Sequence, residues 1–102
     1  MRKANVFFNG AQAGILEEIS PTQYRFIYHT DYQGQPISLT MPTTQKIYEF
    51  NTFPPFFEGL LPEGAMLEML LRKYKINKND YFGQLLQVGQ DMVGAVTVSS
   101  AL

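Results

Sequence analysis

The stretch that most constrains the fold is residues 53–64, which read FPPFFEGLLPEG and combine three phenylalanines, three prolines and two glycines with only two charged side chains. A continuous helix would not tolerate so many breakers, because proline lacks the backbone N–H and clashes with the preceding turn. An ordinary loop would not carry so much apolar side chain. The pattern predicts a short helical turn that begins at Pro54 or Pro55 and stops near Leu61, followed by a second helix.

Length and composition indicate one soluble globular domain, residues 1–102, with a modest hydrophobic core. Hydrophobic residues make up 45% and charged residues 17% of the chain, which is typical of a folded protein. The net charge of −1 argues against direct binding of nucleic acid, which needs clustered cations. The basic cluster Arg72, Lys73, Lys75 and Lys78 is interpreted as the end of a helix, where cations complement the macrodipole.

The absence of cysteine excludes disulfides and thiolate chemistry, and it favours a cytoplasmic setting. The N-terminal residues lack the apolar run of a signal peptide. No stretch approaches the roughly 20 apolar residues of a membrane span, so no association with a membrane is expected.

The first half of the chain reads as strands. Asn9-Gly10 is the preferred pair for a tight hairpin, because both residues tolerate positive φ. Tyr24, Phe26 and Tyr28 alternate and therefore share one face of a strand. The predicted strands are residues 4–8, 12–19, 24–29 and 37–41, with a short extended piece around 47–50.

The segment 37–41, ISLTM, alternates apolar and polar residues cleanly. This period of two predicts a strand with Ile37, Leu39 and Met41 directed inward. Pro42 would end it.

In the second half the apolar period changes to that of helices. Residues 64–74 form one predicted helix, whose apolar face contains Met66, Leu67, Leu70, Leu71 and Tyr74. A second helix is expected at residues 81–88, with N-cap candidates in 77–80 and Gly89 as its C-cap. Residues 93–98 read as a last strand. The expected fold is α+β: a small antiparallel sheet, made of an N-terminal hairpin and meander plus a C-terminal strand, packed against about three short helices.

Catalytic equipment is not recognisable. His29 is the single histidine, and no phosphate-binding glycine loop occurs. His29 and Asp31 form the one near pair of metal-ligand types, so no metal site and no cofactor are expected. Glu58 and Glu63 are interpreted as charges at helix ends. We therefore expect a binding module and not an enzyme, with a small enzyme of unknown type as the alternative.

Met66 and Met69 widen the apolar arc of the predicted helix at 64–74 beyond what one sheet contact needs. Flexible thioether side chains serve adaptable binding surfaces as well as cores. A wide apolar arc on a small domain indicates a second partner surface. Core packing is the interpretation for Leu67, Leu70 and Leu71.

Several motifs together resemble the HipA family of bacterial serine/threonine-kinase toxins. Residues 56–64, FFEGLLPEG, are similar to the family signature FF-[DE]-x-L-L-P-E-G of the N-terminal subdomain that precedes the kinase core. Residues 6–14, VFFNGAQAG, resemble its opening hairpin, and residues 37–42, ISLTMP, resemble a following strand. Residues 89–96, GQDMVGAV, are similar to its G-x-D-x-x-G-A-V segment.

The resemblance implies a kinase-associated subdomain without kinase activity of its own, because no His-Arg-Asp or Asp-Phe-Gly segment is present. A free-standing form of this subdomain resembles the HipS antitoxins of tripartite HipBST toxin–antitoxin systems. The partners so implied are a HipT-like serine/threonine kinase toxin and a HipB-like helix-turn-helix DNA-binding protein in the same complex. The alternatives are a non-inhibitory accessory or positioning subunit of the kinase complex, and a remnant of a fused HipA-type toxin.

On this interpretation the chain binds and neutralises the kinase by docking near its active site, through the proline-bracketed corner and the start of the following helix. The residues expected to contact the partner are Phe57, Leu61, Pro62, Glu63, Gly64, Ala65, Met66 and Met69.

Overall fold

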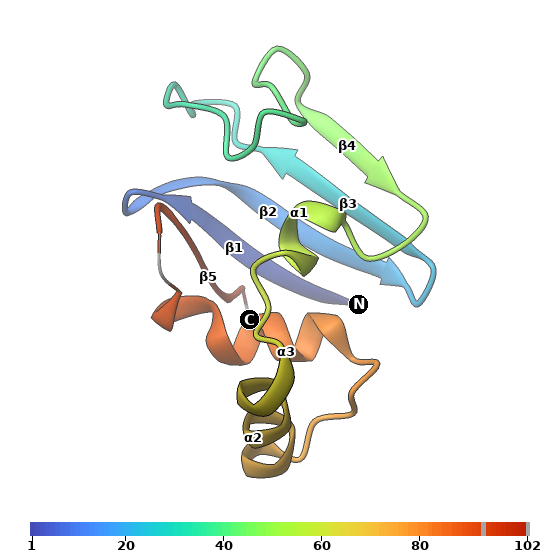
Figure 1. The fold of residues 1–102 in the computed structure, drawn as a ribbon. Helices are drawn as coiled ribbons and strands as arrows, with labels where there is room; N and C mark the ends of the chain where they lie inside the picture. Colours follow the sequence, from blue (N-terminus) through green and yellow to red (C-terminus); the bar gives the residue numbers. More distant parts are fainter. Residues whose placement is uncertain (93, 102) are drawn as a thin grey trace.

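The protein is described by a computed structural model that covers residues 1–92 and 94–101, and its α+β class is as predicted (Figure 1). Five strands and three α-helices are found in this part of the chain, with one turn of 3-10 helix, η1. The elements in chain order are β1 (Arg2–Phe8), β2 (Ala11–Ser20), β3 (Gln23–Tyr28), β4 (Ile47–Phe50), α1 (Pro55–Glu58), α2 (Gly64–Tyr74), α3 (Tyr81–Val88), η1 (Gly89–Asp91) and β5 (Val96–Ser100).

The strands form one antiparallel sheet in the order β4-β3-β2-β1-β5. Asn9 and Gly10 make the predicted hairpin turn, with φ of 50° and 85°. The register of this hairpin shifts after Val6, where β2 carries one extra residue, and the shift sets Arg2 opposite Glu18. The last strand begins at Val96, later than predicted, and Val93 of the predicted strand lies outside the described residues.

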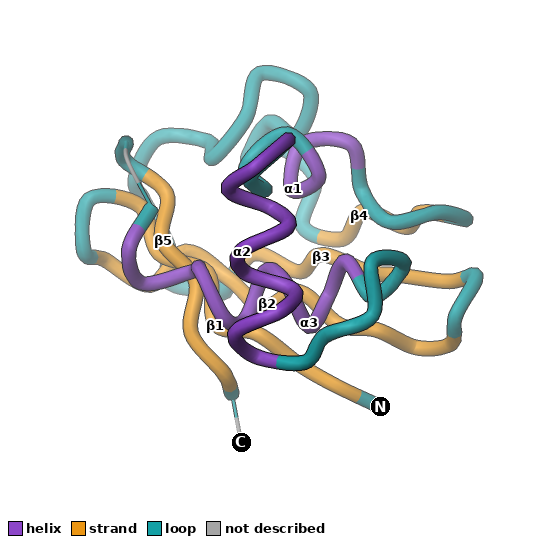
Figure 2. Tube along the Cα trace, turned by 60° about the horizontal axis from the view of Figure 1, so that its bottom comes forward, coloured by secondary structure: helices purple, strands orange, loops and turns teal. Residues whose placement is uncertain are grey.

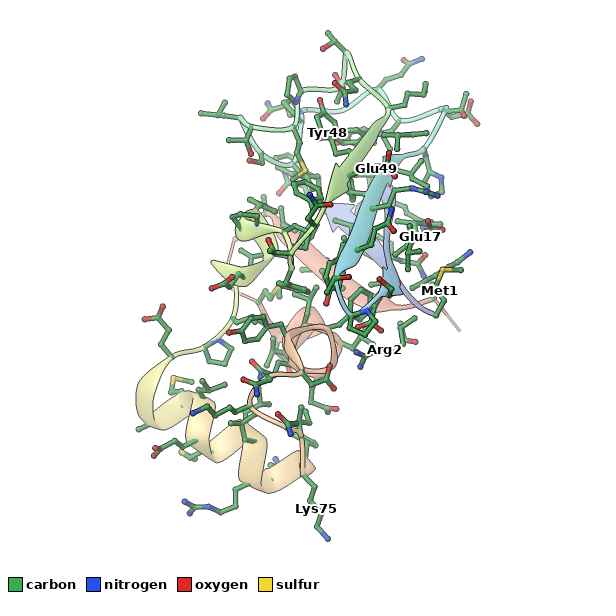
Figure 3. All side chains as sticks on the ribbon, turned by 90° about the vertical axis from the view of Figure 1, so that its right-hand side faces the viewer. Met1, Arg2, Glu17, Tyr48, Glu49 and Lys75 are labelled. Atoms are coloured by element: carbon green, nitrogen blue, oxygen red, sulfur yellow. The ribbon has the colours of Figure 1, made fainter. Side chains whose placement is uncertain are left out.

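The helices lie on one side of the sheet, and the core is formed between them and the sheet (Figures 1 and 3). Tyr24, Phe26 and Tyr28 are buried on this inner face, as predicted. Gly14 lies beneath Phe26, and a Cβ at Gly14 would stand 2.9 Å from that ring and 2.2 Å from the carbonyl oxygen of Ile27. The other large buried side chains come from both layers: Leu16, Met41, Phe53, Phe57, Phe82 and Leu85.

The predicted strand at residues 37–41 is wrong. The backbone turns there, with the Met41 N–H donating to the carbonyl of Ser38 at 3.1 Å. Ile37 and Met41 are buried as expected, but Leu39 at the tip is 96% exposed. The cause is Tyr28, whose hydroxyl donates to the Met41 carbonyl at 2.6 Å and accepts from the Ile37 N–H at 3.0 Å.

Tyr28 therefore holds both ends of this turn against the sheet. Burial raises the pKa of the Tyr28 phenol, which keeps the hydroxyl protonated and able to donate. The alternation of apolar residues in this segment reflects two anchored ends and a free tip.

The helix signals of the sequence are confirmed in position. Pro55 is the first residue of α1, where its missing N–H has no helical partner to lose. Asp80 caps α3 by accepting a hydrogen bond from the Gly83 N–H at 3.0 Å. Gly89 is the C-cap of α3, but it keeps right-handed helical angles because the chain continues into η1. A Cβ at Gly89 would lie 2.3 Å from the Val98 carbonyl oxygen, so the glycine lets α3 approach β5.

Candidate protein-binding surface

Helix α2 lies on the far side of α3 from the sheet (Figures 1 and 3), and in Figure 2 it is seen in front of α3 and the strands. It has 11 residues, and none of them is buried. Leu67, Leu70 and Leu71 are half-buried and do not belong to the core cluster, so the prediction that they pack in the core is wrong. Met66 and Met69 are 72% and 68% exposed, which agrees with the expectation that the apolar arc of this helix exceeds what one contact needs.

A sharp corner joins α1 to α2. Glu63 is the N-cap of α2 in an extended conformation, and its side chain makes no capping hydrogen bond. Gly64 follows with a φ of +60°, a value that L side chains rarely adopt. No heavy atom lies within 4 Å of the position a Cβ would take at Gly64, so this glycine serves the backbone angle and not a close approach. The corner therefore turns the chain sharply and leaves the first turn of α2 open.

The eight residues predicted to contact a partner divide into three groups. Phe57 is fully buried against Phe26 at a ring distance of 6.0 Å, so its side chain supports the fold and is not itself a contact surface. Leu61 and Pro62 are half-buried. The remaining five are exposed at the corner and along α2: Glu63, Gly64, Ala65, Met66 and Met69.

An open groove of about 830 Å³ lies between α2 and the end of α3. The segment between α1 and α2 contributes Leu60 and Pro62 to its lining, and α2 supplies Met66, Met69 and Leu70. The opposite wall comes from the end of α3 and the residues after it: Gln87, Val88, Asp91 and Met92. We call this cavity the α2 groove; Gly59, Arg72, Lys73 and Tyr74 complete its lining.

The C-terminal end of α2 is strongly basic. Arg72 and Lys73 lie in its last turn, Lys75 is the C-cap, and Lys78 follows. Within residues 1–92 and 94–101, none of these four side chains forms an ion pair with a carboxylate. The Lys73 ammonium lies 5.2 Å from the centre of the Tyr74 ring, and Figure 3 shows Lys75 at the far end of α2, away from the sheet. We call these four residues the basic end.

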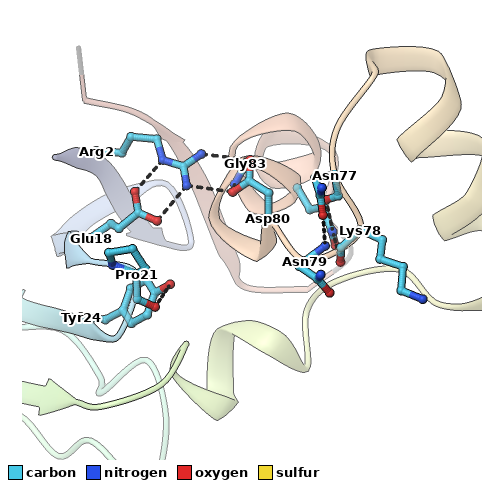
Figure 4. Close-up of polar contacts among 10 residues, drawn as sticks. Arg2, Glu18, Pro21, Tyr24, Asn77, Lys78, Asn79, Asp80 and Gly83 are labelled. Atoms are coloured by element: carbon cyan, nitrogen blue, oxygen red, sulfur yellow. Dashed lines mark hydrogen bonds and ion pairs between the residues drawn. The ribbon is translucent and has the colours of Figure 1, made fainter.

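The cations of the sheet are paired. Arg2 donates two hydrogen bonds of 2.7 Å to the carboxylate of Glu18 and two, of 2.8 and 3.2 Å, to that of Asp80 (Figure 4). These bonds, first to Glu18 and then to Asp80, raise the pKa of Arg2, and the bond from Arg2 lowers the pKa of Asp80. On the outer face of the sheet, ion pairs of 3.3 to 3.6 Å connect four strands through Lys3, Glu17, Arg25 and Glu49.

The wall of the α2 groove that the end of α3 supplies was not predicted from the sequence. Val88 and Met92 line the α2 groove although they lie in a different element from Met66 and Met69, and no sequence pattern indicates that α3 and α2 meet there. In the part of the chain that the structure describes, no three carboxylate or imidazole groups gather to hold a metal ion. None of the helices in this part has the length and apolarity that crossing a bilayer requires.

Comparison with known proteins identifies relatives of this chain. The family model of the HipA N-terminal domain matches residues 4–99. An uncharacterized protein of Haemophilus influenzae is 36% identical over 98 residues, which cover 96% of this chain and 92% of that protein. A putative kinase of Sinorhizobium fredii is 36% identical over 66 residues, which cover 61% of this chain and 16% of the kinase. A solved structure of the N-terminal domain of HipA toxin matches with a TM-score of 0.79 and 33% identity, and covers 100% of this chain and 94% of that one.

Proposed function

Because this chain belongs to the HipA N-terminal domain family, we propose that it is an antitoxin that binds and neutralises a separate HipA-like serine/threonine kinase. In the terms of tripartite systems it corresponds to HipS, its target to a HipT-like kinase, and the third member of the complex to a HipB-like DNA-binding protein. The chain itself has no catalytic role in this proposal and makes no contact with DNA. The proposed place of action is the cytoplasm.

The exposed methionines of α2 carry the proposal. A helix that buries no residue and presents Met66 and Met69 to solvent gains little from its own domain. Adaptable apolar side chains of this kind suit a surface that becomes buried against another protein. In a family defined by the N-terminal domain of a kinase toxin, the kinase is the natural partner for that surface.

The relatives support a partner in a separate chain. The same domain is matched within a putative kinase, where it accounts for a small part of the length. It is also matched by a Haemophilus influenzae protein that is only slightly longer than the aligned region. A contact made within one chain in the first case would have to be made between two chains in the second, and a short chain of this kind needs an exposed docking surface.

The proposed contact is the corner at residues 61–66, together with Met69, placed near the active site of the kinase. Leu61 is packed against the core, Pro62 fixes the backbone φ just before Glu63, and α2 begins at Gly64 directly after it. A loop held in this way loses little conformational freedom on binding. Occupying the approach to the active site would exclude the kinase substrate.

The test uses two substitutions at the corner, Ala65→Asp and Met66→Asp. Both residues are exposed, so the domain should fold normally while a buried charge at the interface weakens binding to the kinase by about ten-fold or more. Leu39→Asp is the matched control, because it places the same charge on an exposed apolar residue of the 37–41 turn. Binding is measured by pull-down with a candidate HipT-like kinase from the same organism, and inhibition by kinase autophosphorylation with and without each variant.

Unchanged binding and unchanged inhibition by both corner variants would refute the proposed contact. A wild-type protein that binds the kinase but leaves its autophosphorylation and its effect on growth unaltered would instead identify an accessory subunit. The two measurements therefore separate where the chain binds from what its binding does.

A further inference from the structure

We propose that the α2 groove is a docking site for an acidic amphipathic helix of a partner protein. The proposal deepens the proposed function, since it states the chemistry of the surface that the partner presents, and it rests on that function in assuming that the partner is a protein. The α2 groove adjoins the proposed kinase contact and shares Pro62, Met66 and Met69 with it.

The shape and lining of the α2 groove fit one face of a helix. One wall is α2 itself, whose 11 residues extend over about 16 Å, or three helical turns. Met66, Met69 and Leu70 lie on this wall at the spacing of neighbours on one helix face, and Val88 and Met92 face them from the other wall. Two or three apolar side chains on successive turns of a bound helix would fill such a space.

The lining of the α2 groove favours a helical occupant over an extended one. The groove is lined by residues of helices and turns, and none of the lining residues that the structure describes belongs to a strand. An extended peptide placed there would leave its N–H and C=O groups without partners on an apolar surface. A helix satisfies these groups internally and presents only side chains.

The cations beside the α2 groove indicate that the partner carries negative charge. The protein as a whole has a net charge of −1, but residues 72–78 carry four cations and no carboxylate. All three cations that project from the sheet are paired with carboxylates: Arg2, Lys3 and Arg25. The basic end is unpaired among the described residues, and two of its members, Arg72 and Lys73, line the α2 groove beside a single carboxylate, Asp91. A bound helix that carries carboxylates next to its apolar face would pair these cations.

A second copy of this chain does not meet these requirements. Among the helices that the structure describes, α1 and α2 each contain one carboxylate, Glu58 and Glu68, and α3 contains none. Nucleic acid would engage the basic end but would leave Met66, Met69 and Val88 without a partner. An acidic helix of another protein accounts for both the apolar groove and the cations that have no carboxylate partner among the described residues.

The test is an unbiased selection. A phage library that displays a helical scaffold, randomised on one face, is selected against the wild-type protein and in parallel against the Met66→Asp/Met69→Asp double variant. We expect peptides enriched on the wild-type protein alone, with apolar residues three or four positions apart and an excess of Asp and Glu beside them. Affinities of the selected peptides are then measured for Arg72→Glu/Lys73→Glu and for the Leu39→Asp control.

The charge-reversal variant should bind the selected peptides about ten-fold more weakly, and higher ionic strength should weaken binding to the wild-type protein, while the control is unchanged. Enriched peptides without an excess of carboxylates, or with equal affinity for the charge-reversal variant, would overturn the proposal. It would also fail if no peptide prefers the wild-type protein over the double methionine variant, or if the wild-type protein instead binds labelled single-stranded DNA or RNA.

The outcome is independent of the kinase experiments. Ala65→Asp should keep its affinity for the selected peptides while it loses the kinase, because Ala65 does not line the α2 groove. Peptide binding without kinase binding would refute the proposed function alone, and kinase binding without acidic peptides would refute this inference alone.

Discussion

The sheet with α1 and α3, and the helix α2, differ in almost every physical respect. In the first region Phe26, Phe57 and Phe82 are buried, and the cations of the sheet are paired with carboxylates. Glycine at positions 14 and 89 allows neighbouring elements to approach closely. In α2 no residue is buried, and the cations at its end have no carboxylate partner among the described residues. The first region has the features that make a domain stable, and the second has the features of half an interface.

The motif FFEGLLPEG spans the boundary between the two regions. Phe57 lies in the core, and Gly64 to Met66 are exposed only a few residues later. One end of this short motif is therefore packed in the core, and the other end is exposed to solvent. This arrangement predicts that substitutions along the motif separate into those that unfold the domain and those that affect only binding.

The largest expected effect is on stability at Phe57. Phe57→Ala removes a fully buried ring that packs against Phe26 and Phe56, and it should lower the free energy of unfolding by about 3 to 5 kcal/mol. Met69→Ala, in α2, should change it by less than about 0.5 kcal/mol, because Met69 is largely exposed. Urea denaturation followed by circular dichroism measures both.

Phe57→Ala can fall below the stability that a domain of this size needs, so Phe57→Leu is the milder variant, with an expected loss of about 1 to 2 kcal/mol. If Met69→Ala proved as destabilising as Phe57→Leu, α2 would belong to the core and the distinction between the two regions would be lost.

A smaller effect is expected at Arg2. Arg2→Met removes the group that connects β1 and β2 to the N-terminus of α3, and leaves the carboxylates of Glu18 and Asp80 without their partner. Because these side chains are partly exposed, the expected loss at neutral pH is about 1 to 2 kcal/mol. Lys73→Met, the matched variant at the basic end, should change stability by less than about 0.5 kcal/mol.

The stability that the Arg2–Asp80 pair contributes should depend on pH. Arg2 lowers the pKa of Asp80 below its ordinary value of 3.8, so the stability that the pair contributes is complete above that value. It is lost as the pH falls through the lowered pKa of the folded state. The difference between Arg2→Met and the wild-type protein should therefore shrink as the pH falls below 3.8 and through the lowered pKa of Asp80, and a constant difference would show that Arg2 acts through packing on Phe82 instead.

Local signals in the sequence predict much of the fold, and long-range geometry explains what they miss. Asn9-Gly10 predicts the hairpin because the turn needs positive φ, and the period of 3.6 predicts α2 and α3. The extra residue near Ala13 has no local signature, although it moves the partner of Arg2 from Glu17 to Glu18.

One part of the candidate site can also be predicted from local sequence signals, and the other part cannot. The corner and the methionines of α2 are recognisable from proline, glycine and the width of the apolar arc. The α2 groove is not recognisable, because it depends on where the end of α3 lies relative to α2. The end of α3 packs closely on β5, where Gly89 meets Val98, and that contact is remote in sequence from α2. Tertiary packing decides how one element docks on another, and no periodic pattern in the sequence indicates it.

A small effect at Leu39 and a large one at Met41 are expected in the turn at residues 37–41, where the predicted strand is wrong. Leu39→Ser should change the free energy of unfolding by less than about 0.5 kcal/mol, because the side chain at the tip is almost fully exposed. Met41→Ala, two residues away, should cost about 2 to 5 kcal/mol because Met41 is buried. A strand would have made the two residues equivalent, so comparable losses in urea denaturation would restore the strand, whereas a large difference attributes the alternation to the two ends that Tyr28 holds.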